Sequence, residues 1–548
     1  MPLYLLVTER SGNKRTVAMN PVDAVSVGRD TSCGISLPDS KVSRKHCTIV
    51  ADDLGLRVID HNSRNGTLVN EIPVKESCAV KVGDVIQAGD SRIALVTELK
   101  QEASEGQPAP PPSHARAGGW GKRLVYRITC PNCWHAFFPH KVSFVAKHPE
   151  LIGDPVLGSN EFLRFQPKRF TPAGEAVDPK GIPTSELACP LCHLPIVEIL
   201  LEVAPLFISL VGSPASGKSY FLATMTWELR RMMPRAFLSF TDADPAVNAC
   251  ITDYERTLFM NPRPESPTQI IKTDQTDSRL HRRYQIKGVD VRVPVPFQFL
   301  LQPTPQHPGY TRAAQASRIV VLYDNAGEDF RPGAETAESA AIQHLAASHV
   351  LLVLYDLAQD PRFRGASTSN DPQLTRGLRP EFGPQGALDR QETILREASV
   401  LLRRHLGLAH DKRISRPLIV IVPKFDIWQE MAGLRIDTEP YTQQGDSGPL
   451  LVDTARVEEA SDSLRKVLLR YSPEFVATAE NLSAAVRYIP VSSLGCSPTF
   501  VRKGNYYGIS PKDIHPRWVT VPLLYSLCKW APGMISSVPK AGQKGDRG

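Results

Sequence analysis

The chain has 548 residues, of which 42% are hydrophobic and 22% charged, a globular composition with room for three or more domains. The 64 Lys and Arg residues exceed the 57 Asp and Glu residues by a formal charge of +7, which is too dilute for a dedicated nucleic-acid binder because phosphate binding needs clustered cations. The composition also excludes a collagen, a disordered tail protein and a disulfide-dense secreted scaffold.

Targeting signals and cysteine usage indicate the compartment. The most apolar segment, 196–212, carries Glu198 and Glu202, and no stretch approaches the roughly 20 apolar residues of a membrane helix. The N-terminus lacks the basic start, long apolar region and cleavage site of a secretory signal. Four of the 10 cysteines form two Cys-x-x-Cys pairs and the others are scattered singly, which agrees with a cytoplasmic location.

The first predicted domain covers residues 1–99. Short alternating apolar segments separated by Gly, Asn and Asp indicate a small all-β domain. Residues 100–119 are rich in Pro, Gly and Ala without apolar periodicity, so we predict a flexible linker there.

Short loop motifs occur in a characteristic order and spacing within this domain. They are Gly28-Arg29, Ser43-Arg44-Lys45-His46, Asn62-Ser63-Arg64-Asn65-Gly66-Thr67, Val69-Asn70 and Gly83-Asp84. The set resembles the forkhead-associated (FHA) domain, a β-sandwich that reads phosphothreonine in extended peptides. Phosphothreonine brings nearly two negative charges, so its recognition needs a guanidinium fork with hydroxyl and amide donors on rigid loops.

The FHA resemblance implies roles for five residues. Arg29 and Ser43 match the phosphate ligands, and Arg44 is placed to help them. Asn65 matches the residue that holds the peptide backbone, and Arg64 lies where specificity for neighbouring residues is set. The partner is then a threonine-phosphorylated protein; the alternative is a sandwich whose binding has decayed.

The two cysteine pairs lie at the ends of the second predicted domain, residues 120–200. Cys130-Pro-Asn-Cys133 and Cys189-Pro-Leu-Cys192 are two thiolate knuckles that together complete a tetrahedral zinc site. The segment resembles a zinc ribbon only at its two ends, with an insertion at 134–188. Four thiolates leave no open position, so the Zn²⁺ is expected to be structural. A redox dithiol is the competing interpretation.

The third predicted domain, residues 201–532, alternates nearly continuous apolar strands with helical stretches at 217–233, 389–408 and 453–471. This pattern predicts an α/β domain with a mainly parallel sheet covered on both faces. Residues 533–548 are predicted to form a disordered tail.

A Walker A pattern follows the first of these strands. It consists of Gly212, Ser213, Pro214, Ala215, Ser216, Gly217, Lys218 and Ser219. Such a loop turns backbone N–H groups toward phosphates at a helix N-terminus. Lys218 is expected to reach the terminal phosphates and Ser219 to bind Mg²⁺.

Later strand ends resemble the motifs of P-loop GTPases. Asp324-Asn325-Ala326-Gly327-Glu328 resembles Asp-x-x-Gly, in which the Asp holds Mg²⁺ and the Gly senses the terminal phosphate. Lys424 and Asp426 match the guanine-reading Asn-Lys-x-Asp, and Ser492-Ser493 match the Ser-Ala-Lys loop. Pro423 and Ser493-Leu494 depart from these patterns, so ATP or degenerate binding stays open beside GTP and GDP.

Taken together, residues 200–532 resemble the bacterial double-GTPase group of the translation-factor-related (TRAFAC) GTPases. Lys218, Asp324, Gly327 and Glu328 are the implied catalytic residues. Glu328 stands where many GTPases place a water-orienting Gln, so slow GTP hydrolysis is expected. Thr268, Thr273 and Thr276 are the candidate switch threonines in the loop 260–285.

The sequence therefore predicts a cytoplasmic signalling GTPase that its FHA domain recruits to threonine-phosphorylated partners. One alternative is a phosphoprotein-binding adaptor whose nucleotide-binding domain does not hydrolyse its ligand, and another is an ATPase. No direct nucleic-acid partner is expected. Pairing with a second copy or with a partner GTPase is left open, because related GTPases often pair across their nucleotide sites.

Overall fold

The structure is a computed structural model that divides into unit 1, Met1–Gly119, and unit 2, Trp120–Gly548. It describes residues 3–8, 14–19, 24–30, 33–52, 55–70, 72–74, 76–80, 84–96, 124–270, 281–286, 289–326, 340–367, 369, 371–375, 391–445, 448–501, 506–531 and 533–539. The predicted linker at 100–119 lies outside these residues. Among the described residues, no helix combines the length and the apolar character needed to span a bilayer.

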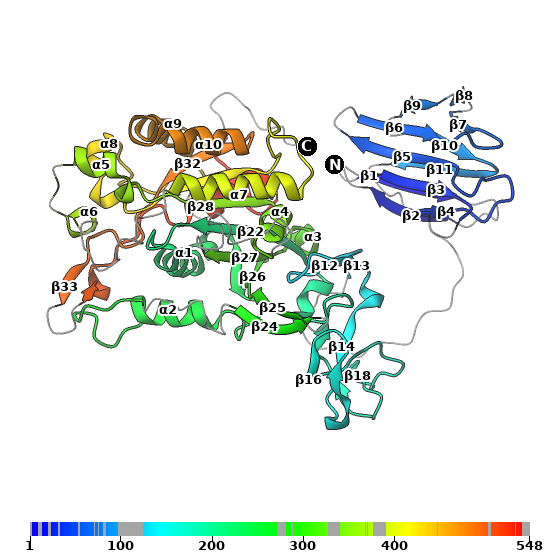
Figure 1. Cartoon of the computed structure of the whole chain (residues 1–548), viewed down its shortest axis with the longest axis horizontal. Helices are drawn as coiled ribbons and strands as arrows, with labels where there is room; N and C mark the ends of the chain where they lie inside the picture. Colours follow the sequence, from blue (N-terminus) through cyan, green and yellow to red (C-terminus); the bar gives the residue numbers. More distant parts are fainter. Residues whose placement is uncertain are drawn as a thin grey trace. The chain divides into compact units, whose positions relative to one another are not determined.

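Unit 1 consists of two β-sheets, which confirms the prediction of a small all-β sandwich (Figure 1). The first sheet has the order β2-β1-β11-β10-β7-β8 and the second the order β4-β3-β5-β6-β9. The strands are β1 Leu3–Thr8, β2 Lys14–Met19, β3 Ala24–Gly28, β4 Ile35–Ser36, β5 Cys47–Asp52, β6 Gly55–Asp60, β7 Thr67–Val69, β8 Ile72–Pro73, β9 Ser77–Ala79, β10 Val85–Ala88 and β11 Ser91–Val96. Inward-facing residues of both sheets, among them Leu5, Ile49 and Ile93, form one buried core.

The central sheet of unit 2 has the order β23-β26-β27-β22-β28-β29-β32. Its strands are β22 Ala204–Gly212, β23 Leu238–Asp242, β26 Phe297–Pro303, β27 Arg318–Ala326, β28 Val350–Leu354, β29 Leu418–Val422 and β32 Val486–Pro490. Neighbours from β27 to β32 pair in parallel, whereas β26 pairs antiparallel with both β27 and β23. The sheet is therefore mixed, and β26, next to the edge strand β23, is the strand of this sheet that runs against the others.

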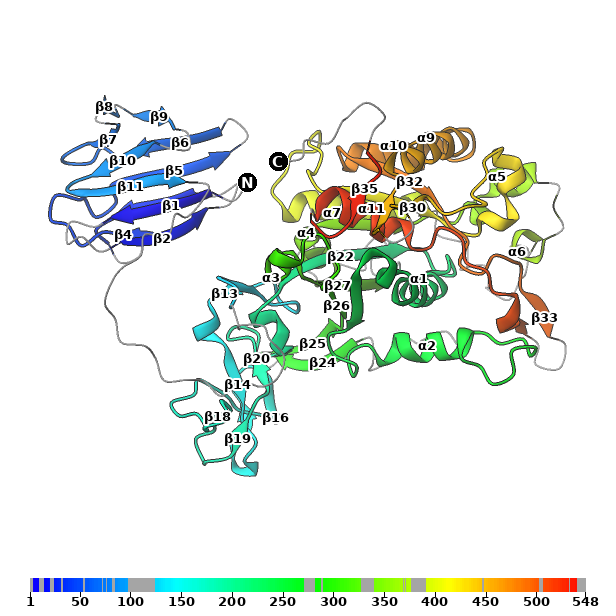
Figure 2. The same cartoon turned by 180° about the vertical axis from the view of Figure 1, so that it is seen from behind.

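Helices cover both faces of this sheet. The helices are α1 Lys218–Met232, α2 Ala249–Phe259, α3 Ala313–Ala316, α4 Ala340–Ala347, α5 Pro361–Ala366, α6 Pro372–Thr375, α7 Gln391–His405, α8 Gln429–Ala432, α9 Thr454–Tyr471, α10 Pro473–Leu482 and α11 Val521–Trp530. α1 packs on α2, and α7 packs on α4 and α10; Figures 1 and 2 show the two groups on opposite sides of the sheet. The three predicted helices are confirmed as α1, α7 and α9.

The cysteine-rich segment is built from short strands. They are β12 Ile128–Thr129, β13 Ala136–Phe137, β14 Ser143–Val145, β15 Ile152–Asp154, β16 Gly158–Phe162, β17 Arg164–Phe165, β18 Ala176–Val177, β19 Pro183–Thr184, β20 Leu187–Ala188 and β21 Pro195–Ile196. Ile128 and Phe137 share one buried core with Phe207 of β22 and Tyr323 of β27. The segment therefore covers part of the central sheet, and the structure places it in the same unit as that sheet.

The described part of unit 2 contains three further small sheets. β24 His281–Ile286 pairs with β25 Val289–Pro294, and β33 Thr499–Val501 pairs with β34 Tyr506–Gly508. β31 Leu450–Val452 pairs with β30 Tyr441–Gln443 and, in parallel, with β35 Ser536–Ser537. Met534 and Ile535 are buried, so the prediction of a disordered tail is wrong for residues 533–539.

Candidate functional sites

The predicted phosphopeptide residues lie on three loops of unit 1 that hydrogen bonds bring together. Arg29 directly follows β3, and its backbone N–H donates to the Ser43 carbonyl at 2.9 Å. The Ser43 Oγ accepts from the backbone N–H of Arg64 at 3.0 Å. Arg29, Arg44 and Arg64 all have exposed side chains. The loops thus carry three exposed arginines on backbone segments that lie close to Ser43, whose hydroxyl can still donate its own hydrogen.

Asn65 lies in the same loop cluster, and its side chain connects two of these loops. Its Nδ2 donates to the Lys41 carbonyl at 2.7 Å, which ties the loop after β6 to the loop before β5. The amide oxygen is the part of this side chain that this contact does not use. The five predicted residues are therefore placed together, with Asn65 also acting as a brace.

His46 and Gly28 fix the shape of these loops. The buried His46 accepts from the Ser43 N–H at Nδ1 (3.1 Å), so its Nε2–H donates to the Gly66 carbonyl (3.1 Å). A Cβ on Gly28 would lie 2.2 Å from the Arg44 carbonyl oxygen. No side chain larger than hydrogen fits at position 28 unless the loop moves.

Asp60 is a loop-bracing residue that sequence reasoning missed. Its carboxylate accepts from the Ser63 N–H and Oγ and, at 2.5 Å, from the Thr67 Oγ1. Burial alone would raise the pKa of Asp60, but these hydrogen bonds outweigh it and lower that pKa. The carboxylate orders the loop that carries Arg64 and Asn65.

The four cysteines of the two pairs converge in unit 2. Their Sγ atoms all lie within 4.8 Å of one another, with Cys130 to Cys192 at 3.8 Å and Cys133 to Cys189 at 3.7 Å. Four sulfurs placed tetrahedrally at about 2.3 Å from Zn²⁺ would stand about 3.8 Å apart. The donor set and its spacing therefore fit a tetrahedral zinc ion.

The two knuckles have the same local geometry. Residues two positions after the first cysteine donate their N–H groups to its sulfur, Asn132 to Cys130 at 3.3 Å and Leu191 to Cys189 at 3.4 Å. The residue after each second cysteine has a positive φ, 56° at Trp134 and 61° at His193. His193 directs Nδ1 to the Asp154 carboxylate at 2.9 Å, and the cluster found among the described residues contains the four cysteines alone.

The predicted phosphate loop connects β22 to α1. β22 ends at Gly212 and α1 begins at Lys218, with positive φ values at Ala215 (59°) and Gly217 (94°). The Lys218 Nζ donates to the carbonyls of Gly212 (2.7 Å) and Ser213 (3.4 Å). This is the strand, turn and helix arrangement that anion binding at a helix N-terminus requires.

The other predicted nucleotide-binding residues that the structure describes lie at the same edge of the sheet. Gly212 pairs with Ala326 and Leu354 across the parallel strands, and Leu354 pairs with Ile421, which pairs with Ile489. Asp324 lies two residues before Ala326 in β27. Lys424 and Asp426 follow the end of β29, and Ser492 and Ser493 follow the end of β32. Ligands of open α/β sheets bind at such carboxyl ends, where the strand order reverses.

Two buried polar atoms at this edge have no hydrogen-bond partner among the described residues: Ser216 Oγ and Asp324 Oδ1. Burial raises the pKa of Asp324, and the charge of Lys218 partly offsets it. Buried groups of this kind normally find a partner. Gly327 and Glu328 lie outside the described residues.

The two predicted base-reading loops contact each other. Ser492 Oγ donates to Asp426 Oδ1, and it accepts from the Gly495 N–H at 2.8 Å. Burial raises the pKa of Asp426, and the hydrogen bond from Ser492 partly offsets this. Ser493 is buried beside Ser492. The structure thus brings these predicted residues together around one partly buried carboxylate.

A polar network behind the phosphate loop was not predicted. Gln391 at the start of α7 accepts from Ser213 Oγ (3.1 Å) and from the Asp356 N–H (2.8 Å) and donates to the Asp356 carbonyl (2.8 Å). The fully buried Asp356 carboxylate pairs with Lys424 Nζ at 2.5 Å. The Gln359 amide donates to the Pro214 carbonyl at 3.2 Å. The network joins the phosphate loop to the loop of Lys424.

One candidate switch threonine is described. Thr268 forms an antiparallel bridge with Ile509, with N–H to carbonyl distances of 2.9 and 2.8 Å. Two residues later, the Ile270 N–H donates to Tyr220 Oη at 3.1 Å, which brings this segment to the first turn of α1. Thr273 and Thr276 lie outside the described residues.

Comparisons with known proteins find most of their similarity in the N-terminal part of the chain. The family model of the FHA domain matches residues 25–89. The glycogen accumulation regulator GarA of Mycobacterium tuberculosis is 34% identical over 107 residues, which are 20% of this chain and 65% of GarA. This chain thus spans just under two thirds of the length of such relatives. A solved structure from work on phosphothreonine-dependent FHA domain interactions is 33% identical and covers 18% of this chain and 100% of its own, with a TM-score of 0.16.

One relative is similar over a longer stretch. SaeC of Mycolicibacterium smegmatis, a candidate ESX-1 scaffolding and assembly protein, is 25% identical over 366 residues, which are 64% of this chain and 83% of SaeC. That alignment is longer than unit 1, which ends at Gly119, so the similarity to SaeC extends into unit 2. The match over residues 25–89 and the loops described above make this chain an FHA-domain protein with its FHA domain in unit 1.

Proposed function

We propose that the FHA domain binds proteins phosphorylated on threonine and that the chain acts as an adaptor in a signalling assembly. The observation that carries this proposal is the hydrogen bond from the Arg64 N–H to Ser43 Oγ beside Arg29. It brings the loops that carry the exposed Arg29, Arg44 and Arg64 to one serine hydroxyl, and charge-assisted bonds from arginines on such loops suit a dianionic phosphate. The scaffolding role attributed to SaeC supports the adaptor part.

Binding of phosphothreonine peptides to the full chain tests this proposal. Arg29→Ala should weaken the affinity on the order of a hundredfold, because it removes a charge-assisted pair to the phosphate. Arg92→Ala, which removes an exposed arginine from β11, should leave the affinity unchanged. The proposal is wrong if Arg29→Ala folds and binds like the parent chain, or if unphosphorylated peptide binds equally well.

Unit 2 offers a second function, the binding of GTP or GDP with Mg²⁺. The supporting observation is the row of predicted residues along the carboxyl edge of five parallel strands, where Ser216 Oγ and Asp324 Oδ1 have no hydrogen-bond partner within the part of the chain that the structure describes. Ser219 and Asp324 would hold Mg²⁺, which neutralises phosphate charge when bound. Lys218 would move from the loop carbonyls to the phosphates.

In this proposed site, Asp426 would recognise the base of the nucleotide. A carboxylate accepts from the N–H and amino groups of guanine, a donor pattern that adenine lacks. Lys424 is held by Asp356 at the opening of the same loop, where its stem can cover the base. GTP hydrolysis with Glu328 as the water-orienting residue remains a prediction, as do the cytoplasmic location and pairing with another GTPase.

Nucleotide binding is tested by identifying the nucleotide that co-purifies and by titrating fluorescent GDP into the full chain. Lys218→Ala should abolish binding, whereas Lys466→Ala, an exposed lysine on α9, should not. Asp426→Ala should remove the preference for guanine over adenine. A single-turnover GTP assay then decides between enzyme and adaptor: phosphate release no faster than in Lys218→Ala would contradict the GTPase.

The cysteine cluster supports a third assignment, a structural Zn²⁺ held by Cys130, Cys133, Cys189 and Cys192. Elemental analysis should find about one zinc per chain. Absence of zinc from a stably folded chain, or a disulfide between paired cysteines, would favour the redox dithiol.

A further inference from the structure

Each cysteine knuckle is followed by a residue with a positive φ whose ring N–H group is held by a buried oxygen. After the first knuckle, Trp134 has a φ of 56° and donates its Nε1–H to Tyr323 Oη at 3.0 Å. After the second, His193 has a φ of 61°, and its Nδ1 lies 2.9 Å from both carboxylate oxygens of Asp154. A non-glycine residue in this backbone conformation is uncommon and persists where its surroundings hold it.

The two buried oxygens come from different parts of unit 2. Tyr323 belongs to β27 of the central sheet, whereas Asp154 is the last residue of β15, within the insertion at 134–188. Both are almost fully buried, with 1% of Tyr323 and 3% of Asp154 exposed. The insertion thus provides for the second knuckle the kind of anchor that the sheet provides for the first.

Backbone groups of the insertion fix the Asp154 carboxylate. Its Oδ1 accepts from the N–H groups of Val156 and Leu157, both at 2.9 Å. Its Oδ2 accepts from the Arg164 N–H at 3.0 Å. A carboxylate has acceptor sites beyond these three bonds, and the ring of His193 uses them. Because a carboxylate can only accept, the ring carries its hydrogen at Nδ1.

Two more residues of the insertion contact the second knuckle. The side chain of Arg164 is 3% exposed, and its Nε donates to the His193 carbonyl at 2.9 Å. Leu157 packs on Leu194, and Cys192 lies against this buried pair. His193 is therefore held both at its ring and at its backbone, next to a cysteine of the proposed zinc site.

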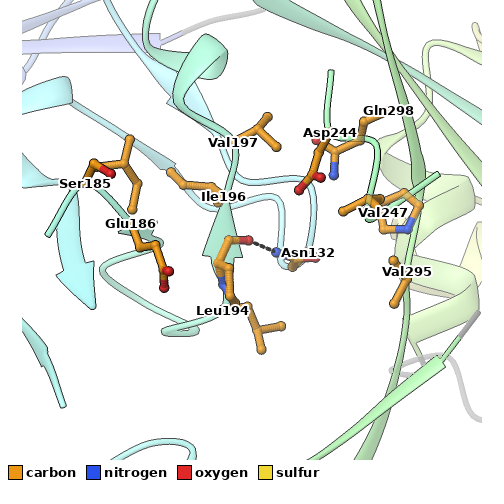
Figure 3. Close-up of a pocket in the computed structure, with 13 residues that line it drawn as sticks. Asn132, Ser185, Glu186, Leu194, Ile196, Val197, Asp244, Val247, Val295 and Gln298 are labelled. Atoms are coloured by element: carbon orange, nitrogen blue, oxygen red, sulfur yellow. Dashed lines mark hydrogen bonds between the residues drawn. The ribbon is translucent and has the colours of Figure 1, made fainter. Parts of the chain in front are cut away.

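On another side, the second knuckle borders open space. Leu194 and Pro195 line a cavity of about 400 Å³ whose lining also includes Asp244 and Val247 (Figure 3). The dashed line in Figure 3 marks the contact that spans the two knuckles, from Asn132 Nδ2 to the Pro195 carbonyl at 3.1 Å. Because the cavity leaves this side without close packing, the contacts from the insertion matter more for the shape of the knuckle.

We propose that Asp154 is a positioning residue for the zinc site, and that it acts through the His193 ring. This inference rests on the zinc assignment made above. The His193 N–H donates to the Cys189 carbonyl at 3.0 Å, so the anchored residue also closes the turn that carries Cys189 and Cys192. Groups around metal ligands typically change metal affinity 10–100-fold when they are lost. The insertion serves to keep the second pair of sulfurs in place.

The test is the rate at which the full chain loses zinc to an excess of a chromophoric chelator. His193→Phe keeps a ring but removes the N–H group, and it leaves the backbone contacts of Asp154 intact. Asp154→Asn places an amide group against donors. Each substitution should speed zinc release on the order of tenfold. Because both break the same link, the double variant should release zinc no faster than the faster single variant.

Asp178→Asn is the matched control. Asp178 is another buried carboxylate of the insertion, and its printed hydrogen bonds go to backbone N–H groups outside the knuckles. Its substitution should lower the Tm without changing the rate of zinc release. Cobalt(II) bound in place of zinc reports the ligand geometry in its visible absorption, so His193→Phe and Asp154→Asn should change that spectrum and Asp178→Asn should not.

Three results would overturn the proposal: zinc release at the parental rate in His193→Phe, additive effects in the double variant, or equal acceleration by Asp178→Asn. If Asp154→Asn does not fold, the comparison of His193→Phe with Asp178→Asn decides. Zinc that is bound but released at the parental rate contradicts the role of Asp154 alone. Absence of zinc from the parent chain contradicts the zinc assignment itself, and this inference with it.

Discussion

Asp178 shows how a single buried carboxylate holds the inserted segment between the two cysteine pairs. Its Oδ1 accepts from the N–H groups of Lys180 and Ile182, both at 2.9 Å. Its Oδ2 accepts from Lys147 at 3.1 Å and His148 at 3.0 Å. The side chain is 1% exposed, so one residue satisfies four backbone donors from two loops that short strands alone would not order.

Asp178→Asn should destabilise unit 2 by roughly 1–3 kcal/mol, because the new amide group opposes backbone donors that need an acceptor. Burial alone would raise the pKa of Asp178, but the hydrogen bonds from the backbone outweigh this effect and lower that pKa. A carboxyl with a lowered folded-state pKa stabilises the fold above the ordinary aspartate pKa of about 3.9, and this contribution is lost as pH falls through the folded value. Urea unfolding should therefore show a parent-to-variant difference at pH 7 that shrinks below about pH 4; a difference independent of pH would contradict this.

Gly28 is a residue where one methyl group should disturb the proposed phosphopeptide site. Gly28→Ala places a Cβ 2.2 Å from the Arg44 carbonyl oxygen, so the loop of Ser43 and Arg44 must shift at a cost of roughly 1–3 kcal/mol. We expect a lower Tm for unit 1 and weaker binding of phosphothreonine peptide. Gly34→Ala is the matched control, since its nearest contact would be a Val25 methyl at 3.3 Å. Equal effects of both substitutions would contradict the steric argument.

At the scale of secondary-structure elements, the sequence predicts the strands, turns and helices that depend on a local pattern of residues. The strand, loop and helix around Lys218 and the helix now seen as α7 follow from apolar periodicity and a glycine-rich turn. The Gln391 contact to Asp356 does not, because a Gln at the start of a helix carries no signal for a partner 35 positions away. Strand β35 was missed for a similar reason: most of the tail is polar, and the segment is ordered by long-range contacts, namely pairing with β31 and burial of Met534 and Ile535 in the core.

Gln391 should be the position where α7 controls the phosphate loop. Gln391→Met keeps the volume but removes the hydrogen bonds to Ser213 and to both backbone groups of Asp356. The loss should cost roughly 1–3 kcal/mol of stability and weaken the proposed nucleotide binding on the order of tenfold, since Ser213 and Lys424 lose their common brace. Fluorescent GDP titration measures this, with Arg396→Gln on the exposed side of α7 as control. Unchanged affinity would show that the network does not position the loop.

At the scale of unit 2 as a whole, the cysteine-rich segment and the central sheet act as one folded body. Ile128 and Phe137 of the segment lie in the same core as Phe207 and Val321 of the sheet. The Tyr323 hydroxyl anchors this core with two hydrogen bonds: its Oη accepts from Trp134 Nε1 at 3.0 Å and donates to the Pro131 carbonyl at 2.6 Å. Tyr323 directly precedes Asp324 in β27, so the anchor connects one knuckle to the strand of the proposed magnesium site.

Tyr323→Phe tests whether the Tyr323 hydroxyl stabilises both the fold of unit 2 and the first cysteine knuckle. The substitution keeps the ring in the core but leaves the Trp134 N–H and the Pro131 carbonyl without their buried partner, at a cost of roughly 1–3 kcal/mol. Because Pro131 and Trp134 belong to the first knuckle, we expect faster loss of the proposed zinc to a chelator as well as a lower Tm. Tyr507→Phe, a partly buried tyrosine of β34 away from the knuckles, is the control for losing a hydroxyl. Zinc release at the parental rate despite a lower Tm would mean that the sheet stabilises the segment without holding the knuckle in shape.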